Sequence, residues 1–293
     1  MIVPGTDSQA LASAIARQTG LELAAVTVEH FPDGELLVGI PGFDADEAIL
    51  VASTTTSRAH LEVLQLQDAI REAGASSITT VLPYMGYARQ DKPMAPGSTL
   101  EESPVGYPIS ARAMARAIST GTDRVLVVNP HEEGVLDFFD VPAIAVDATS
   151  ELATGLPDDL EDPLFVAPDK GARDMATAIQ SAYGNGSVDY FAKTRLDAET
   201  VSIEPSDADP GGRDVVIVDD IIATGGTVSQ AVQVLTERNA SRVFVTCVHG
   251  ILAERARTRI ERAGVDTIVA TDTIEDPISR VSVAPLIADA LDD

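Results

Sequence analysis

The sequence predicts an α/β protein with two domains, each built on a doubly wound parallel sheet. Short apolar runs alternate along the chain with stretches in which apolar residues recur at the helical period. This alternation implies parallel strands with helices on both faces of the sheet. The 293 residues suffice for two domains of ordinary size, each with its own core.

Nine apolar runs have the length and composition of strands. They span residues 48–53, 77–84, 124–130, 143–148, 164–169, 188–194, 214–220, 242–248 and 266–272. Between them lie helical stretches such as 59–75. The pattern pauses at the proline- and acid-rich residues 155–163, so we place the domain boundary just before them. The predicted domains are 1–147 and 148–293. An alternative for the last helix is that it packs back on the first domain.

The composition limits the partners of the protein. With 46 acidic and 20 basic residues the formal net charge is −26, and such a surface repels nucleic acids and anionic membranes. No apolar run reaches the roughly 18 residues of a membrane span, and no secretory signal opens the chain. A single cysteine, Cys247, excludes a disulfide framework. We expect a cytoplasmic protein without nucleic-acid or membrane partners, adapted to high salt.

Lysine is scarce in this chain. Only three of the 20 basic residues are lysines, namely Lys92, Lys170 and Lys193. Arginine supplies simple positive charge equally well, whereas lysine offers a compact ammonium with rotatable donors. The three lysines are therefore candidates for specific roles.

Polar residues that directly follow the apolar runs are the first candidates for a site, because ligands bind at the carboxyl ends of parallel strands. The stretch "VVIVDDIIATGGT" ends a strand on Asp219 and Asp220 and continues into a glycine turn. Gly225 and Gly226 allow backbone amides to close around an anion, at the positive end of the next helix. The alternative is a structural turn in which an aspartate acts as a cap.

The side chains of this stretch suit a ribose phosphate. Thr224 and Thr227 add hydroxyl donors for the phosphate. The two aspartates suit ribose hydroxyls or a hydrated magnesium ion. The common mononucleotide and dinucleotide glycine motifs, G-x-x-x-x-G-K-[ST] and G-x-G-x-x-G, do not occur in the chain.

This stretch resembles the phosphoribosyl-diphosphate loop of type I phosphoribosyltransferase folds, which several activities share. A second stretch, "PYMGYARQDKP", is similar to the signature of the ribose-phosphate diphosphokinases (phosphoribosyl-diphosphate synthetases). In that family the segment helps to bind ATP, and Arg89 and Gln90 stand at its polar positions. Arginine can fork onto phosphate, and glutamine can bond a neutral partner. The alternative is a salt bridge between Arg89 and Asp91.

The resemblance extends over almost the whole chain and implies a homo-oligomer. The segment "FPDGE" resembles a family loop that contacts adenine, commonly from a neighbouring subunit. Phe31 would stack on the base, and Asp33 or Glu35 would accept its amino protons beside Gly34. Without the resemblance, these residues would indicate a tight turn.

Magnesium is the cofactor that the resemblance implies. "NPHEEGV" is similar to the segment that supplies a metal-binding histidine, here His131, and "APDKGA" to a second metal segment with Asp169. Asn129 and Pro130 stand where the family more often has Asp-Leu. The alternative for Asp169 and Lys170 is an Asp-Lys turn that caps the next helix. A lysine in the place of Lys170 resembles archaeal members of the family, so we expect an archaeal protein.

The segment "FAKTRLDAET" resembles the catalytic flexible loop of the family and carries Lys193 and Arg195. Side chains two residues apart on an extended segment lie on one face, where both can grip a polyphosphate. The alternative is a solvated edge strand. Two further departures from the family are a longer acidic connection, Ser98 to Tyr107, and Ala223 in place of an acid before the Thr-Gly-Gly-Thr loop.

The resemblance thus implies transfer of the diphosphoryl group of ATP to ribose 5-phosphate, with phosphoribosyl diphosphate and AMP as products. The first domain would be the ATP side, with Phe31, Arg89 and Gln90. The second would be the ribose-phosphate side, with Arg195 and the residues 219–227. The alternatives are a non-catalytic regulatory paralogue and a phosphoribosyltransferase.

Overall fold

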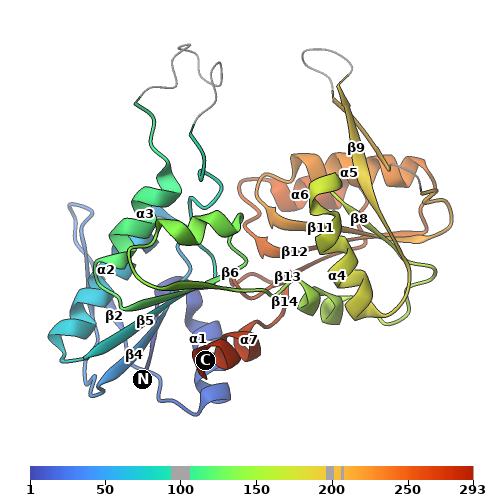
Figure 1. The fold of residues 1–293 in the computed structure, drawn as a ribbon. Helices are drawn as coiled ribbons and strands as arrows, with labels where there is room; N and C mark the ends of the chain where they lie inside the picture. The colour runs from blue at the N-terminus through green and yellow to red at the C-terminus, as the bar shows by residue number, and fades with distance from the viewer. Residues whose placement is uncertain (94–105, 196–200, 206–207, 293) are drawn as a thin grey trace. The chain divides into compact units, whose positions relative to one another are not determined.

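Two parallel sheets organise the protein (Figure 1). The computed structural model describes residues 1–93, 106–195, 201–205 and 208–292. Its contacts divide the chain into two units. Unit 1 comprises Met1–Asp147, Thr273–Glu275 and Ala284–Asp293, and unit 2 comprises Ala148–Asp272 and Asp276–Val283.

Unit 1 contains a five-stranded parallel sheet of order β1-β4-β5-β6-β7. The strands are β1 (Ile2–Pro4), β4 (Glu47–Val51), β5 (Ser77–Leu82), β6 (Arg124–Val128) and β7 (Ala143–Val146). The α-helices are α1 (Gln9–Thr19), α2 (Ser57–Glu72), α3 (Ser110–Ser119) and α7 (Ala284–Asp292), and the 3₁₀ turns are η1 (Thr6–Ser8) and η2 (Glu133–Phe138). A separate antiparallel hairpin joins β2 (Thr27–His30) to β3 (Leu36–Gly39).

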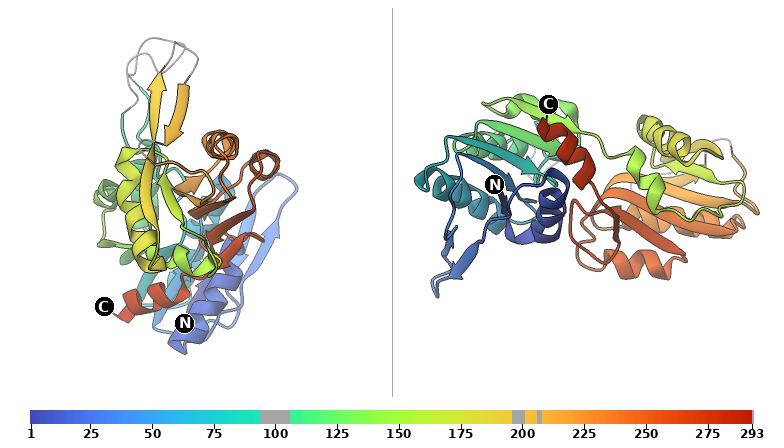
Figure 2. Two further views of the ribbon diagram at one scale, coloured as in Figure 1. Left: turned by 90° about the vertical axis from the view of Figure 1, so that its right-hand side faces the viewer. Right: turned by 90° about the horizontal axis from the view of Figure 1, so that it is seen from below.

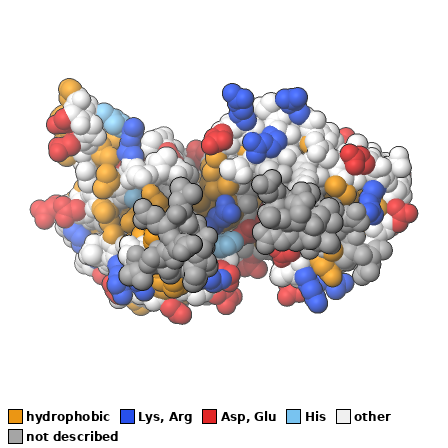
Figure 3. Space-filling model, turned by 90° about the horizontal axis from the view of Figure 1, so that it is seen from above, with side chains coloured by type: hydrophobic (Ala, Val, Ile, Leu, Met, Phe, Trp, Pro, Cys, Tyr) orange, Lys and Arg blue, Asp and Glu red, His pale blue; other side chains and the backbone are white. Residues whose placement is uncertain are grey.

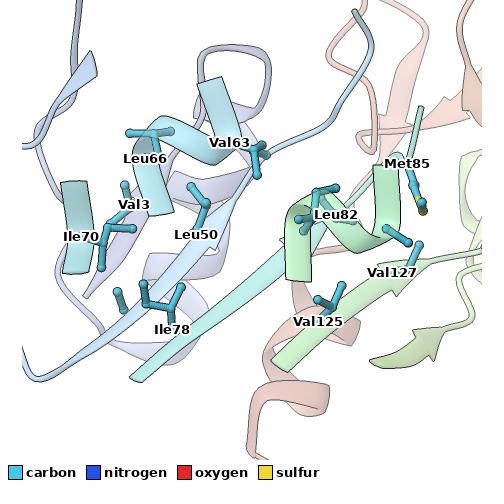
Figure 4. Packing of buried hydrophobic residues seen from close by; sticks show 14 of the residues in the cluster. Val3, Leu50, Val63, Leu66, Ile70, Ile78, Leu82, Met85, Val125 and Val127 are labelled. Carbon is cyan, nitrogen blue, oxygen red and sulfur yellow. The ribbon is translucent and has the colours of Figure 1, made fainter. Parts of the chain in front are cut away.

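Helix α2 shows how the sequence builds this unit. Its N-cap residue Thr56 accepts a hydrogen bond from the Ala59 amide at 3.1 Å, which satisfies one unpaired donor of the first turn. Val63, Leu66 and Ile70 recur at the helical period and are fully buried. They pack with Leu50 of β4 and with other strand residues in one apolar core (Figure 4).

Unit 2 contains a seven-stranded sheet of order β10-β9-β8-β11-β12-β13-β14. The strands are β8 (Leu164–Ala167), β9 (Ser187–Arg195), β10 (Val201–Pro205), β11 (Asp214–Ile222), β12 (Arg242–Gly250), β13 (Thr267–Thr271) and β14 (Ser279–Val281). The helices are α4 (Arg173–Tyr183), α5 (Gly226–Glu237) and α6 (Ala256–Arg262), with 3₁₀ turns η3 (Ser150–Gly155) and η4 (Lys170–Ala172). Helix α4 covers one face of the sheet, and α5 and α6 cover the other (Figure 2).

The α/β class with parallel sheets is confirmed, and each of the nine predicted apolar runs forms a strand. Two pairings depart from the purely parallel expectation, because β2–β3 and β9–β10 are antiparallel hairpins. Helix α7 belongs to unit 1, where it contacts α1. No helix within the described ranges is long and apolar enough to cross a membrane.

Candidate active site

The segment Phe31 to Glu35 forms the tip of the β2–β3 hairpin. The Phe31 amide donates to the Glu35 carbonyl at 2.9 Å, and the Gly34 amide donates to the Phe31 carbonyl at 3.0 Å. Gly34 has φ 94°, and the Asp33 carboxylate accepts from the Glu35 amide at 3.2 Å. The backbone is therefore the tight turn that was considered as an alternative. The Phe31 side chain is nevertheless 42% exposed, which leaves an aromatic surface at the tip.

The arginine-glutamine segment follows β5 and is held by its own chain. The Thr54 amide donates to the Tyr84 carbonyl at 2.9 Å, and the Gly86 amide donates to Thr54 Oγ1 at 2.8 Å. Tyr87 adopts a left-handed φ of 66°, which is uncommon for a bulky residue. The Gln90 side-chain oxygen accepts a hydrogen bond from Ser110 Oγ at 2.7 Å. The segment thus has a fixed backbone path at the carboxyl end of a central strand.

Arg89 is exposed and does not form the salt bridge to Asp91 that was the alternative. Asp91 instead lies 3.7 Å from the Lys92 ammonium, which also contacts Glu132 Oε1 at 2.8 Å. The hydrogen bond with Glu132 raises the pKa of Lys92. Lys92 therefore links the arginine-glutamine segment to the segment that follows β6, a function that sequence reasoning did not assign to it.

His131 is exposed, three residues beyond the end of β6. Asn129, just before it, has φ 38° and donates from Nδ2 to Asp147 Oδ1 at 2.9 Å. A carboxylate from the end of β7 thus lies at this sheet edge, although the sequence has no acid directly before the histidine. Because β5 and β6 are neighbouring parallel strands, the arginine-glutamine segment and His131 share one edge of the sheet of unit 1.

In unit 2, Asp219 and Asp220 lie near the end of β11, where both are partly buried. Asp219 Oδ1 accepts from the Asp220 amide at 3.0 Å, and Asp220 Oδ1 accepts from the Ile221 amide at 2.8 Å. The register places Asp219 beside Cys247 of β12. Burial, and then the charge of Asp219, raise the pKa of the Cys247 thiol, so this cysteine stays protonated.

The Thr-Gly-Gly-Thr loop begins two residues after the end of β11. Backbone carbonyl groups at its start accept hydrogen bonds from other parts of unit 2. The Ala253 amide donates to the Ala223 carbonyl at 2.9 Å, and Arg259 Nη1 donates to the Thr224 carbonyl at 2.8 Å. Gly225 has φ 68°, and α5 begins at Gly226. The first amides of a helix lack partners within the helix, so the loop presents them to an anion.

The exposure of this loop agrees with such a use. Thr224, Gly226 and Thr227 are exposed, whereas Gly225 is buried against α6. The hydroxyl groups and the helix start therefore face outward together. The Arg259 contact is 35 residues away in the sequence and was not predicted.

Asp169 caps the turn η4 at the end of β8. Its Oδ1 accepts from the Gly171 amide at 2.9 Å and from the Ala172 amide at 3.2 Å, so the capping alternative describes part of its role. A carboxylate has lone pairs on both oxygens, so a cap and a metal contact are compatible. Lys170 is exposed beside it. Since β8 and β11 are adjacent and parallel, Asp169 lies at the same sheet edge as Asp219 and Asp220.

Lys193 and Arg195 lie in the part of β9 that pairs only with β10. The register joins Lys193 to Ile203 and Arg195 to Val201, whereas β9 pairs with β8 through Ser187–Tyr190. The hairpin extends past the rest of the sheet (Figure 1). Strand β9 is therefore paired on both sides at Ser187–Tyr190 but on one side only at Lys193 and Arg195. Residues 196–200 of the predicted catalytic loop, and 94–105 of the acidic connection, lie outside the described residues.

The donors present are compatible with magnesium bound mainly by a substrate. Among the described residues, no group of three or more histidine, cysteine or acidic side chains has the arrangement of a metal site. Magnesium often takes only one or two carboxylates from a protein and completes its shell with phosphate oxygens and water. His131 in unit 1 and Asp169 in unit 2 each offer one donor of a kind that binds a metal.

The fold and the site define a class: an α/β protein with parallel sheets and a glycine loop that opens a helix after a central strand. The family model for the N-terminal domain of ribose phosphate pyrophosphokinase matches residues 1–121. The model for the phosphoribosyl synthetase-associated domain matches residues 204–288. The chain belongs to the ribose-phosphate pyrophosphokinase family, as its resemblance predicted.

Relatives agree over their full length. A ribose-phosphate pyrophosphokinase of Halobacterium salinarum is 56% identical, over 99% of this chain and 100% of the relative. One from Methanosarcina acetivorans is 42% identical, over 99% and 98%. The crystal structure of phosphoribosylpyrophosphate synthetase from Mycobacterium smegmatis has a TM-score of 0.80 and 28% identity, covering 100% of this chain and 97% of that one. The sources of the first two agree with the prediction of an archaeal protein, and the first with adaptation to salt.

Proposed function

We propose that this protein transfers the diphosphoryl group of ATP to the anomeric hydroxyl of ribose 5-phosphate. The products are 5-phosphoribosyl 1-diphosphate and AMP. The observation that carries the proposal is the end of β11, where four residues separate two carboxylates from the glycine pair at the start of a helix. Full-length relatedness to named ribose-phosphate pyrophosphokinases supports it.

Ribose 5-phosphate binds at this strand end in the proposed mechanism. The amides at the start of α5 and the hydroxyls of Thr224 and Thr227 hold the phosphate, beside Gly225 and Gly226. The carboxylates of Asp219 and Asp220 accept hydrogen bonds from ribose hydroxyls. Ala223 has no polar side chain, so the sugar receives its side-chain contacts from the two aspartates.

ATP binds through the polar segments of unit 1. The Arg89 guanidinium forks onto phosphate oxygens, and Gln90 bonds a neutral group of the nucleotide. Phe31 stacks on adenine, while Asp33 or Glu35 accepts its amino protons. Support comes from the exposure of Arg89 and of the Phe31 ring.

The reaction is an in-line displacement at the β-phosphorus. The anomeric oxygen forms a bond to that atom, the bond to the oxygen bridging the α- and β-phosphorus breaks, and AMP leaves with that oxygen. The hydroxyl proton passes to solvent. Lys193 and Arg195 hold the transferred group and neutralise its charge. His131 and Asp169 would hold Mg²⁺, which when bound screens the negative charge of the triphosphate.

A homo-oligomer is part of the proposal. Phe31 stands at the tip of a two-stranded hairpin outside the main sheet, and its exposure supports contact with a nucleotide bound by a neighbouring subunit. The cytoplasmic location stays a prediction.

Formation of AMP from ATP, with and without ribose 5-phosphate, tests the activity. We expect AMP and phosphoribosyl diphosphate in equal amounts, and only when both substrates are present. A phosphoribosyltransferase would instead consume phosphoribosyl diphosphate, and a regulatory paralogue would form no AMP. Either outcome contradicts the proposal.

A matched pair of variants tests the sugar site. Asp220→Asn removes one charge at the proposed ribose hydroxyls, and Asp174→Asn removes the same charge on the exposed surface of α4. Hydrogen bonds to charged groups contribute roughly 1.5–3 kcal/mol, so Asp220→Asn should raise the KM for ribose 5-phosphate about ten- to hundred-fold. Equal KM values in the two variants would remove Asp220 from the site.

A further inference from the structure

Helices α5 and α6 of unit 2 enclose a basic hollow on the surface of a strongly acidic chain. The hollow has a volume of about 370 Å³. Basic side chains gather at one edge of the face shown in Figure 3. The hollow between α5 and α6 is lined by Gln233, Arg255, Thr258, Arg259, Arg262 and Ala263. None of these six described residues is acidic, although the chain has 46 acidic and only 20 basic residues.

Three arginines surround this hollow. Arg259 and Arg262 lie on α6, Arg255 is its N-cap residue, and all three line the hollow. All three are exposed. Like charges three or four residues apart on a helix repel one another and destabilise it slightly. An anion bound between them would offset that repulsion.

A fourth arginine of the same helix has a different environment. Arg257 Nε lies 3.0 Å from Glu261 Oε1, and its Nη1 lies 3.8 Å from Asp276 Oδ1. By contrast, Arg255 and Arg262 have no ion-pair partner anywhere in the described ranges. Arg259 donates to the neutral carbonyl of Thr224. Of the four arginines in residues 255–262, the three around the hollow thus lack a carboxylate partner in the described part of the chain, whereas Arg257 has two.

We propose that this hollow binds a small anion with two linked phosphoryl groups, such as inorganic diphosphate or the diphosphate part of a nucleotide. The planar guanidinium group forms paired hydrogen bonds with phosphate oxygens, and three such groups match the charge of a diphosphate. Thr258 and Gln233 add neutral polar groups at the wall. The hollow is separate from the Thr-Gly-Gly-Thr phosphate loop but is joined to it through Arg259.

This connection gives the hollow a route to the proposed ribose-phosphate loop. Arg259 Nη1 is 2.8 Å from the Thr224 carbonyl and 3.7 Å from the position that a Cβ on Gly226 would take. An anion that draws Arg259 toward the hollow weakens its bond to Thr224 and so alters the loop. This consequence rests on the proposed function, whereas anion binding itself does not.

Site-resolved chemical protection tests the binding directly. The full chain is treated with phenylglyoxal in magnesium-free KCl of constant ionic strength, and the modification of each arginine is followed by mass spectrometry of peptides. At a diphosphate concentration about ten times the dissociation constant, Arg255 and Arg262 should react roughly tenfold more slowly. Arg280, an exposed arginine outside the hollow, should react unchanged. Equal effects at all three arginines, or no effect, would overturn the proposal.

The ligand chemistry is resolved by parallel arms. ADP and diphosphate should protect the hollow at lower concentration than phosphate or AMP, because two phosphoryl groups engage more guanidinium groups. Equal protection by sulfate and diphosphate at equal ionic strength would reduce the hollow to an unspecific charged surface and overturn the proposal.

Calorimetry on a matched pair of variants completes the test. Arg262→Gln and Arg280→Gln each remove one exposed positive charge from unit 2. Arg262→Gln should weaken diphosphate binding about tenfold or more, as expected for loss of a charged hydrogen-bond donor, and Arg280→Gln should leave it nearly unchanged. Any diphosphate bound at the proposed active site contributes equally to both titrations. Equal affinities in the two variants would contradict the assignment.

Discussion

Alanine at Gly225 perturbs the backbone of the anion loop at one defined point. Gly225 has φ 68°, and a Cβ there would lie 3.0 and 3.1 Å from two side-chain carbons of Ile260 and 3.3 Å from Ala256 Cβ. The neighbouring Gly226 provides the control. It has no left-handed φ, and the nearest atom to its Cβ would be Arg259 Nη1 at 3.7 Å.

The magnitude follows from these two differences. A left-handed backbone costs an L-residue roughly 1–2 kcal/mol relative to glycine. Ile260 is fully buried, so it cannot move into solvent to relieve the contacts at 3.0 and 3.1 Å. Overpacking of a core typically adds about 1–3 kcal/mol. We expect Gly225→Ala to lower the free energy of unfolding by about 2–5 kcal/mol. Gly226→Ala should be neutral or slightly stabilising, because alanine is the better helix former.

Urea unfolding at constant molar KCl measures this difference. The transition to follow is that of unit 2, because the two units need not unfold together. Calorimetric titration with ribose 5-phosphate on the folded variants reports the loop itself, and we expect weaker binding in Gly225→Ala than in Gly226→Ala. If the two variants have unfolding free energies within about 0.5 kcal/mol of each other, the backbone argument is wrong.

Four further predictions test the site and its setting. Lys193→Ala should lower kcat about 10²–10⁴-fold with smaller changes in KM. Lys193→Arg should not restore kcat fully, because a planar guanidinium cannot replace a compact ammonium. A near-normal kcat of Lys193→Ala in steady-state kinetics would remove Lys193 from catalysis. His131→Gln should raise the magnesium concentration needed for half-maximal rate, and an unchanged titration would make this histidine structural. Burial lowers the pKa of His60 to about 4, so the folded state binds fewer protons than the unfolded state. The free energy of unfolding should therefore fall by about 3 kcal/mol as the pH drops from about 6.5 to 4. His60→Gln should flatten this pH dependence in thermal unfolding between pH 7 and 5, and an unchanged slope would contradict it. Because −26 charges repel one another, the melting temperature should be higher in molar KCl than in dilute buffer, and a flat or falling curve would refute the adaptation to salt.

The main strands were predictable because both sheets are covered on both faces. A strand buried on both faces has a continuous apolar sequence, as in Val215 to Val218, which are all buried. The β2–β3 hairpin was missed because Thr27 to His30 are mostly exposed and form no apolar run. Strands β1 and β14 have three residues each, too few for a periodic pattern.

The site was predictable as far as the strand-end rule extends. Asp219, Asp220 and the following loop lie at the carboxyl end of β11, where the rule places a ligand. The side-chain partners were not predictable, because they are distant in sequence. Lys92 contacts Glu132 across 40 residues, and Arg259 contacts Thr224 across 35. The scarcity of lysine had marked Lys92 as significant but could not indicate its partner.

The placement of α7 has a consequence for the order in which the nascent chain folds. Helix α7 buries Ala284 and Ile287 in unit 1, where it contacts α1, and the Ala290 carbonyl accepts a hydrogen bond from Arg124 Nη2 at 3.1 Å. Unit 2 needs nothing beyond Val283. Although unit 1 leaves the ribosome first, it must wait with an uncovered apolar surface until residues 284–292 have been synthesised. The first domain of a nascent chain usually completes its fold first. Here the order of completion is reversed, because unit 2 can complete its fold before α7 docks on unit 1.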